Sequence, residues 1–190
     1  MISFREIDKS YFKAYDEIPM TVYVKSHYLL EKIDKGLGGI IFKEIPVKEY
    51  IKDFRIYEKA SKYEVRFDIS NWAFFMAFDN ENPIGAVTIV SNTNNLYMLD
   101  GRNDISVLWD IRVADGYKQM GIGQKLFDLV VDWSRRKGLK QMKIECQNNN
   151  VPACKFYHKQ GAVLSKIDEH AYYNDITLRE EVQFIWYLDL

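Results

Sequence analysis

Two glycines, Gly121 and Gly123, stand where an expected strand gives way to an expected helix. The first amides of a helix have no partners inside it, and the helix dipole favours anions at that end. Glycines let the backbone come close to a phosphate because no Cβ stands in the way. The pattern indicates a phosphate-binding loop, and a plain strand-to-helix turn is the alternative.

A second segment, 148–161, combines asparagines with aromatic and basic side chains. Asn150 suits a helix N-cap, and Pro152 is tolerated in a first helical turn. Ala153 and Tyr157 are four residues apart and therefore share one face of the expected helix. Taken alone, Tyr157 would be a core aromatic residue with its hydroxyl at the rim.

Other phosphate and metal motifs do not fit. No third glycine follows Gly123 at the dinucleotide spacing, because Leu126 stands there, and no Gly-Lys-Ser/Thr run marks a nucleoside triphosphate loop. The three histidines lack metal-ligand spacing, so we expect no metal. Cys146 and Cys154 do not form a CxxC pair, and we expect both to be small core residues.

The hydrophobic pattern predicts the elements that position these segments. Strands are expected over 20–33 and 40–42 around a glycine turn, 72–78 and 84–90 as a hairpin, and over 106–113, 139–147, 162–167 and 182–188. Helices are expected over 46–57, 122–137 and 150–160.

This order predicts an α/β (α+β) fold in one domain spanning 1–190. The β-α-β part, 106–147, should form a parallel, right-handed unit, and the remaining strands allow antiparallel neighbours.

Composition narrows the function classes. Hydrophobic residues make up 47% of the chain, which is enough to build a core and argues against general disorder. The net charge of −1 lacks the basic surplus typical of nucleic-acid binders. Residues 1–15 have no apolar run of a secretory signal, and no window suits a membrane span. We expect a cytoplasmic protein with neither a nucleic-acid nor a membrane partner.

Together the two segments resemble the GNAT superfamily of N-acetyltransferases. The acyl-CoA loop of that superfamily, Arg/Gln-x-x-Gly-x-Gly/Ala, corresponds to Lys118-x-x-Gly121-x-Gly123. Its second element corresponds to Asn150-x-x-Ala153-x-x-Phe156-Tyr157-x-Lys159-x-Gly161-Ala162. Lys118 keeps the charge of the usual arginine but loses its planar fork. The resemblance implies a mostly antiparallel central sheet with a parallel, splayed strand pair and flanking helices, and an acetyl-CoA core over about 71–165.

Within the superfamily, the C-terminal half is most similar to streptothricin acetyltransferases. The similarity rests on 147–150, 153–158 and 184–188, with weaker support from 50–54. Those enzymes acetylate an amine on the β-lysine part of the antibiotic streptothricin and so confer resistance.

The resemblance also implies which residues bind acetyl-CoA. They are Ile111, Arg112, Val113, Lys118, Gln119, Met120, Gly121, Ile122, Gly123, Gln124, Asn150, Ala153, Tyr157 and Lys159.

Some of these residues have an implied role in catalysis. Ile111 and Val113 would offer backbone groups to the pantetheine arm, and an amide near Val113 would stabilise the oxyanion. Amides from Gln119 to Gln124 would hold the pyrophosphate. Tyr157 would protonate the departing thiolate, since a tyrosine is protonated at neutral pH. Asn150 would hold the pantetheine or an ordered water.

The base that frees the incoming amine is open between Asp110, on the strand beside the acyl site, and Glu145 on its neighbour. A polycationic acceptor should prefer an acidic cleft edged by aromatic residues. Candidates for that cleft are Asp104, Asp168, Glu169, Tyr172, Tyr173, Asp175 and Glu180.

The expected partner is a small cationic amine such as streptothricin, and a homodimer is left open. One alternative is an acetyltransferase acting on a protein, peptide or polyamine amine. A second alternative is an acyl-CoA-binding sensor domain without turnover, because a fold does not guarantee chemistry.

Overall fold

The computed structural model describes all residues from Met1 to Leu190, and they form two compact units. Unit 1 consists of Met1–Thr21, Asp53–Ile144 and Leu188–Leu190, and unit 2 of Val22–Lys52 and Glu145–Tyr187. Each unit is assembled from segments that lie far apart in the sequence. The single domain expected over 1–190 stays a prediction.

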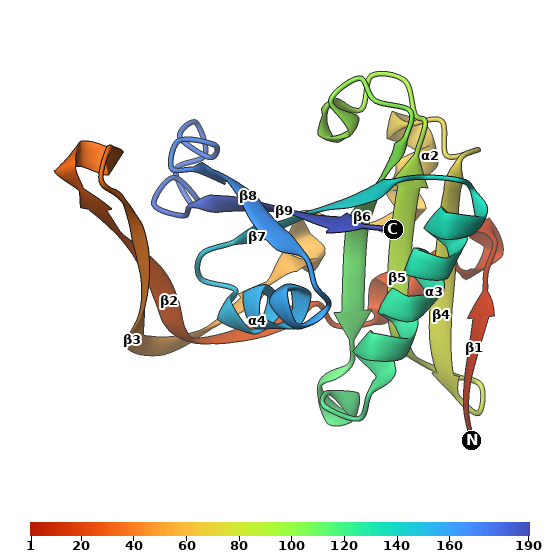
Figure 1. Ribbon diagram of the computed structural model, residues 1–190. Helices are drawn as coiled ribbons and strands as arrows, with labels where there is room; N and C mark the ends of the chain where they lie inside the picture. Colours follow the sequence, from red (N-terminus) through yellow and green to blue (C-terminus); the bar gives the residue numbers. More distant parts are fainter. The chain divides into compact units, whose positions relative to one another are not determined.

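Nine strands and four α-helices make up the chain (Figure 1). The strands are β1 (Ile2–Glu6), β2 (Thr21–Ile33), β3 (Gly39–Asp53), β4 (Trp72–Asp79), β5 (Asn82–Ser91), β6 (Ile105–Val113), β7 (Gln141–Gln147), β8 (Val163–Asp168) and β9 (Gln183–Asp189). The helices are α1 (Phe12–Glu17), α2 (Tyr63–Arg66), α3 (Ile122–Arg136) and α4 (Val151–Lys159). Seven strands follow the order β1-β4-β5-β6-β7-β9-β8, and β2 and β3 form a separate two-stranded sheet.

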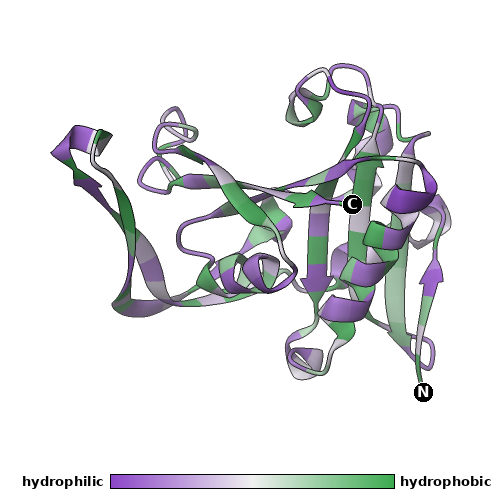
Figure 2. Ribbon diagram, in the orientation of Figure 1, coloured by the Kyte–Doolittle hydropathy of each residue, from purple (hydrophilic) through white to green (hydrophobic).

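The core of unit 1 lies around β4 and β5, which read as almost unbroken apolar runs (Figure 2). Such runs suit strands that are covered on both faces. Helix α3 packs against β4, β5 and β6 (Figure 1), and a Cβ at Gly85 would lie only 3.1 Å from side-chain atoms of Ile122 and Leu126. The Tyr15 hydroxyl of α1 is 2.8 Å from the Thr88 hydroxyl. Because Gly85 and Thr88 alternate along β5, α1 and α3 cover opposite faces.

One strand pair is parallel. Ile105–Leu108 of β6 pairs in register with Gln141–Ile144 of β7, and α3 forms the connection between the two strands. The pairs β1–β4, β4–β5, β5–β6 and β8–β9 are antiparallel. The predicted fold class and the parallel β-α-β unit are therefore confirmed.

Unit 2 contains the β2–β3 ribbon, α4 and the β8–β9 pair. Ion pairs join the two ribbon strands at Lys25–Glu49 and Lys43–Glu31, as expected for cross-strand neighbours. The side chain of Asn148 connects two segments, since it donates to the Tyr28 carbonyl at 3.1 Å and accepts from the Val182 amide at 3.0 Å.

The helix predicted over 46–57 is wrong. Strand β3 continues through this segment to Asp53, and a short 3₁₀ turn, Phe54–Ile56, follows. Pro46 is tolerated because each strand of a two-stranded sheet has an open edge, where a missing N–H costs no ladder hydrogen bond. The helical spacing of the apolar residues was misleading, and the β-branched Ile45, Val47 and Ile51 favour the strand.

Strand β1 and helix α1 were not predicted from the sequence. Strand β1 is short and mostly exposed, so its residues show no regular apolar alternation. Helix α1 contributes the buried Phe12 and Tyr15 to the core of unit 1.

Candidate functional site

The glycine loop of unit 1 leads into α3 through two left-handed residues. A 3₁₀ turn, Asp115–Tyr117, comes first, then Gln119 adopts φ 63° and Gly121 adopts φ 82°. The first hydrogen bond of the helix runs from the Lys125 amide to the Gly121 carbonyl. No side chain caps this helix start, and no acidic residue lies in its first turn. The start of α3 therefore keeps the positive end of its dipole available to an anion.

The loop glycines leave room beside the backbone. A Cβ at Gly121 would meet no atom within 4 Å, although its positive φ would strain any other residue. A Cβ at Gly123 would make only an ordinary contact, 3.7 Å from Val113 Cγ2. These positions leave space for the close approach of a phosphate group, and phosphate binding itself stays a prediction.

Lys118 is engaged within unit 1. Its Nζ donates to the Thr21 carbonyl at 2.7 Å and forms an ion pair with Asp115 at 2.6 Å. Asp115 offsets part of the charge that Lys118 would offer to a phosphate. The backbone amides of the loop are therefore more available to an anion than the Lys118 side chain is.

Strand β6 carries a bulge next to the predicted acyl site. Thr88 pairs with Asp110 and Ile89 with Leu108, so Trp109 is the extra residue of β6. Beyond the bulge, Ile111 and Val113 are half-buried, whereas Asp110 and Arg112 are buried. The two pairs thus occupy opposite faces of the strand.

Asp110 and Arg112 form a buried ion pair. The Arg112 guanidinium donates to both carboxylate oxygens of Asp110, neither side chain is exposed, and the guanidinium carbon lies 4.8 Å from the centre of the Tyr15 ring. Burial raises the pKa of Asp110, and the neighbouring Arg112 charge acts in the opposite direction. The Asp110 carboxylate is bound by arginine and enclosed, and this geometry does not favour it as the base.

In unit 2, Asn150 caps α4. Its side-chain oxygen accepts the Ala153 amide at 3.3 Å, which satisfies one of the first amides of the helix. Tyr157 lies two turns further along and is 6% exposed, whereas Lys159 is exposed. The expected core positions of Cys146 and Cys154 are confirmed, since both thiols are buried and free.

Glu145, on β7, forms a polar cluster of unit 2 with Tyr172 and Gln147. The Tyr172 hydroxyl donates to Glu145 Oε1 at 2.7 Å and accepts from Gln147 Nε2 at 3.1 Å. Burial and the Glu145 charge raise the pKa of Tyr172, so its hydroxyl stays protonated. Glu145 is half-buried and has no cationic partner within unit 2. Of the two base candidates, it is the one whose carboxylate is not bound by arginine.

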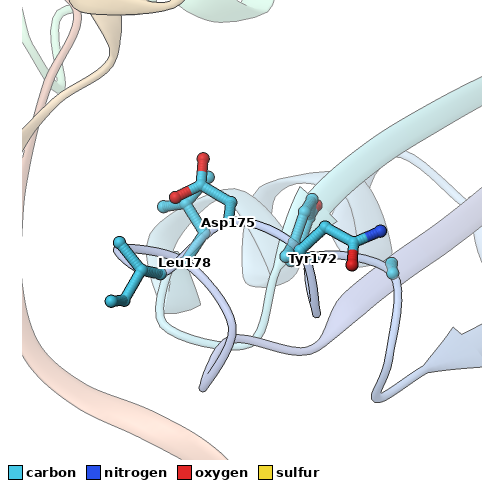
Figure 3. A pocket seen from close by; sticks show the side chains of 6 residues that line it. Tyr172, Asp175 and Leu178 are labelled. Atoms are coloured by element: carbon cyan, nitrogen blue, oxygen red, sulfur yellow. The ribbon is translucent and has the colours of Figure 1, made fainter.

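Tyr172 also lines a shallow pocket of about 510 Å³ with Asp175 and Leu178 (Figure 3). Asp175 accepts hydrogen bonds from the amide and hydroxyl of Thr177, which hold the carboxylate in the loop. The pocket brings together two of the predicted acceptor residues, Tyr172 and Asp175.

The other predicted acceptor residues are dispersed. Four carboxylates form ion pairs at Asp104–Arg102, Asp168–Lys166, Glu169–Lys32 and Glu180–Arg179, and the side chain of Tyr173 is largely exposed. Exposed pairs of this kind contribute little to binding or stability.

A family model described as the acetyltransferase (GNAT) family matches residues 40–162, well over half of the chain. The chain belongs to the GNAT family. It is accordingly an N-acetyltransferase, and the matched range includes the glycine loop and α4.

Two curated relatives and one solved structure are similar to this GNAT chain. Streptothricin acetyltransferase A of Bacillus subtilis (strain 168) is 29% identical over 115 residues, which are 60% of this chain and 61% of that protein. Streptothricin acetyltransferase of Escherichia coli is 23% identical over 175 residues, covering 90% and 91%.

The solved structure is that of a Bacillus anthracis (Ames) protein in complex with acetyl coenzyme A. It superposes with a TM-score of 0.79 at 24% identity and covers 100% of both chains. This likeness shows that the GNAT chain shares its fold.

No group of three or more His, Cys, Asp or Glu side chains could hold a metal ion. No helix is long and apolar enough to cross a membrane.

Glu58 was not predicted from the sequence as a site residue. Its carboxylate accepts a hydrogen bond from the Trp109 indole at 3.1 Å. No local motif includes Glu58, and it meets Trp109 only in the folded GNAT chain.

Proposed function

We propose that this chain transfers the acetyl group of acetyl-CoA to an amine of streptothricin, on its β-lysine part. The observation that carries the first half of this proposal is the uncapped, glycine-lined start of α3 inside the region that the GNAT model matches. The printed names of the relatives support the choice of acceptor.

In this proposal the amides from Gln119 to Gln124 hold the pyrophosphate of the coenzyme. The helix dipole and the lack of an acidic first turn favour a dianionic group there. Lys118 adds a weaker, partly neutralised charge. Met120 is 60% exposed and offers its backbone more than its side chain.

The backbone of Ile111 and Val113 would pair with the pantetheine arm, and an amide near Val113 would stabilise the oxyanion. The bulge at Trp109 supports this assignment, because a bulge re-aims the strand next to it. The Arg112 side chain is buried and forms an ion pair with Asp110.

For the chemistry we propose Tyr157 as the proton donor and Glu145 as the base. Glu145 would take a proton from the acceptor's ammonium, directly or through water. The neutral amine would then form a bond to the thioester carbonyl carbon, the C–S bond would break, and Tyr157 would protonate the thiolate. The nitrogen would lose its second proton to water as the amide forms, and Tyr157 would regain a proton from water. Asn150 and Ala153, at the start of α4, and Lys159, at its end, would contact the coenzyme.

An acceptor panel tests this function. Purified protein with acetyl-CoA should release free CoA thiol with streptothricin, and mass spectrometry should show one acetyl group added to the antibiotic. Spermidine and a peptide with a free N-terminus are the comparison acceptors.

Each contrary result has a defined meaning. Turnover of the peptide or spermidine but not of streptothricin would overturn the proposed acceptor and favour the alternative amines. Acetyl-CoA binding without turnover of any acceptor would favour a sensor domain. Failure to bind acetyl-CoA would refute the whole proposal.

A further inference from the structure

Glu58 is a half-buried carboxylate of unit 1 that forms no ion pair. The indole N–H of Trp109 donates to its Oε2 at 3.1 Å. Burial raises the pKa of Glu58, the Trp109 hydrogen bond lowers it, the negative charge of Asp110 raises it, and hydrogen bonding by Tyr63 and the charge of Arg66 lower it. A partly desolvated carboxylate of this kind gains from a cation that comes to it.

Aromatic side chains surround this carboxylate. The ring of Trp109 lies 5.5 Å from Trp72, 5.7 Å from Phe67 and 6.4 Å from Tyr63, measured between ring centres. Trp72 and Tyr63 are buried, whereas Trp109 and Phe67 are half-buried. The half-buried rings form the part of the cluster that a ligand can reach, and aromatic faces attract cations.

The hydroxyl of Tyr63 is a second donor beside this carboxylate. Tyr63 is fully buried, and hydrogen bonding by its hydroxyl lowers the pKa of Glu58. Burial, followed by the charges of Asp110, Tyr15 and Glu58, raises the pKa of Tyr63, so its hydroxyl stays protonated and can donate. The Trp109 indole and the Tyr63 hydroxyl therefore both position the Glu58 carboxylate.

The position on β6 relates this cluster to the reaction. Trp109 is the bulged residue, two positions before Ile111, whose backbone we assign to the pantetheine arm. Trp109 and Ile111 lie on the half-buried face of the strand, away from the buried Asp110.

We propose that Glu58, Tyr63 and Trp109 form a subsite that binds an ammonium group of the acceptor. Glu58 is its counterion, and the Trp109 indole and the Tyr63 hydroxyl position the carboxylate. This inference rests on the proposed function, because it names the group that recognises the charge of the amine substrate.

The test measures binding and turnover separately in three variants. Glu58→Gln keeps the shape and the hydrogen bond from Trp109 but removes the charge. Tyr63→Phe removes only the hydroxyl that helps to position Glu58. Glu64→Gln is the matched control, since Glu64 is exposed on the neighbouring α2 and pairs only with Lys9 at 3.3 Å. Thermal unfolding and acetyl-CoA affinity should be nearly unchanged in all three, which shows that each variant folds.

We expect Glu58→Gln to raise the KM for streptothricin roughly tenfold or more, because a charged hydrogen bond is lost, with a smaller change in kcat. Tyr63→Phe should raise that KM roughly fivefold without lowering stability. The Trp109 indole N–H signal in a ¹H–¹⁵N spectrum, assigned with Trp109→Phe, should shift when streptothricin is added to the wild type with CoA. It should not shift in Glu58→Gln.

The inference is overturned if the wild-type Trp109 signal does not respond to streptothricin, or if it responds equally in Glu58→Gln. Acetyl transfer by the wild type is a separate result. If the signal responds through Glu58 but no acetylated product forms, the proposed function fails and the ammonium subsite stands.

Discussion

The two long helices begin in opposite ways. Helix α3 starts from a left-handed glycine, with no side chain on its first amides, whereas α4 starts from Asn150, whose side chain accepts the Ala153 amide. A missing N-cap typically lowers the free energy of unfolding by about 1 kcal/mol, so the uncapped start of α3 makes the protein less stable than a capped start would. The difference teaches that α3 keeps backbone groups available for a ligand, while α4 satisfies its own start and contributes through side chains such as Tyr157.

The largest effect should come from a side chain of α4. Tyr157→Phe removes the proposed proton donor and should lower kcat roughly a hundredfold, while acetyl-CoA affinity stays close to normal. Steady-state kinetics and calorimetry measure the two quantities. Unchanged turnover would remove Tyr157 from the chemistry and break the division of roles between the helices.

A smaller effect should come from the start of α3. Gly123→Val should weaken acetyl-CoA binding roughly tenfold, because its side chain would enter space that the protein leaves open beside the phosphate-binding amides. Calorimetry checks the affinity. Gly116→Val is the matched control, since Gly116 lies just before the loop and a Cβ there would meet nothing within 4 Å, and this variant should bind normally. Equal affinities in the two variants would contradict coenzyme binding by the amides at the start of α3.

The smallest effect should come from the cap of α4. Asn150→Ala should lower the free energy of unfolding by about 1 kcal/mol, whereas Asn150→Asp keeps an acceptor for the Ala153 amide and should retain stability. Chemical denaturation measures both. If Asn150→Asp loses acetyl-CoA affinity at normal stability, the Asn150 amide group also holds the ligand. If neither variant is destabilised, the cap does not account for the contrast with α3.

Much of this arrangement was readable from the sequence because its signals are local. The glycines around α3, the cap at Asn150 and the apolar runs of β4 and β5 each act within a few residues of the feature they specify. The resemblance to the GNAT family could be recognised for the same reason. The segment after Pro46 was mispredicted because its apolar spacing suits a helix, while pairing with the preceding strand β2 decided the outcome.

The candidate site was less predictable. Strand alternation alone places Asp110 and Arg112 on one face of β6, but that face became core because α1 covers it with Tyr15. This burial moves Asp110 away from the role of base. No sequence pattern marked Glu58, because its environment depends on the hydrogen bond from Trp109, which lies far away in the chain.

The sequence by itself determined the glycine loop, the capped helix and the parallel β-α-β unit, since glycine conformation, capping and hydrophobic period act over short distances. Only the tertiary structure decided which carboxylates are neutralised and which are left for a ligand. Desolvation and pairing depend on neighbours brought together by folding, and no local pattern encodes them.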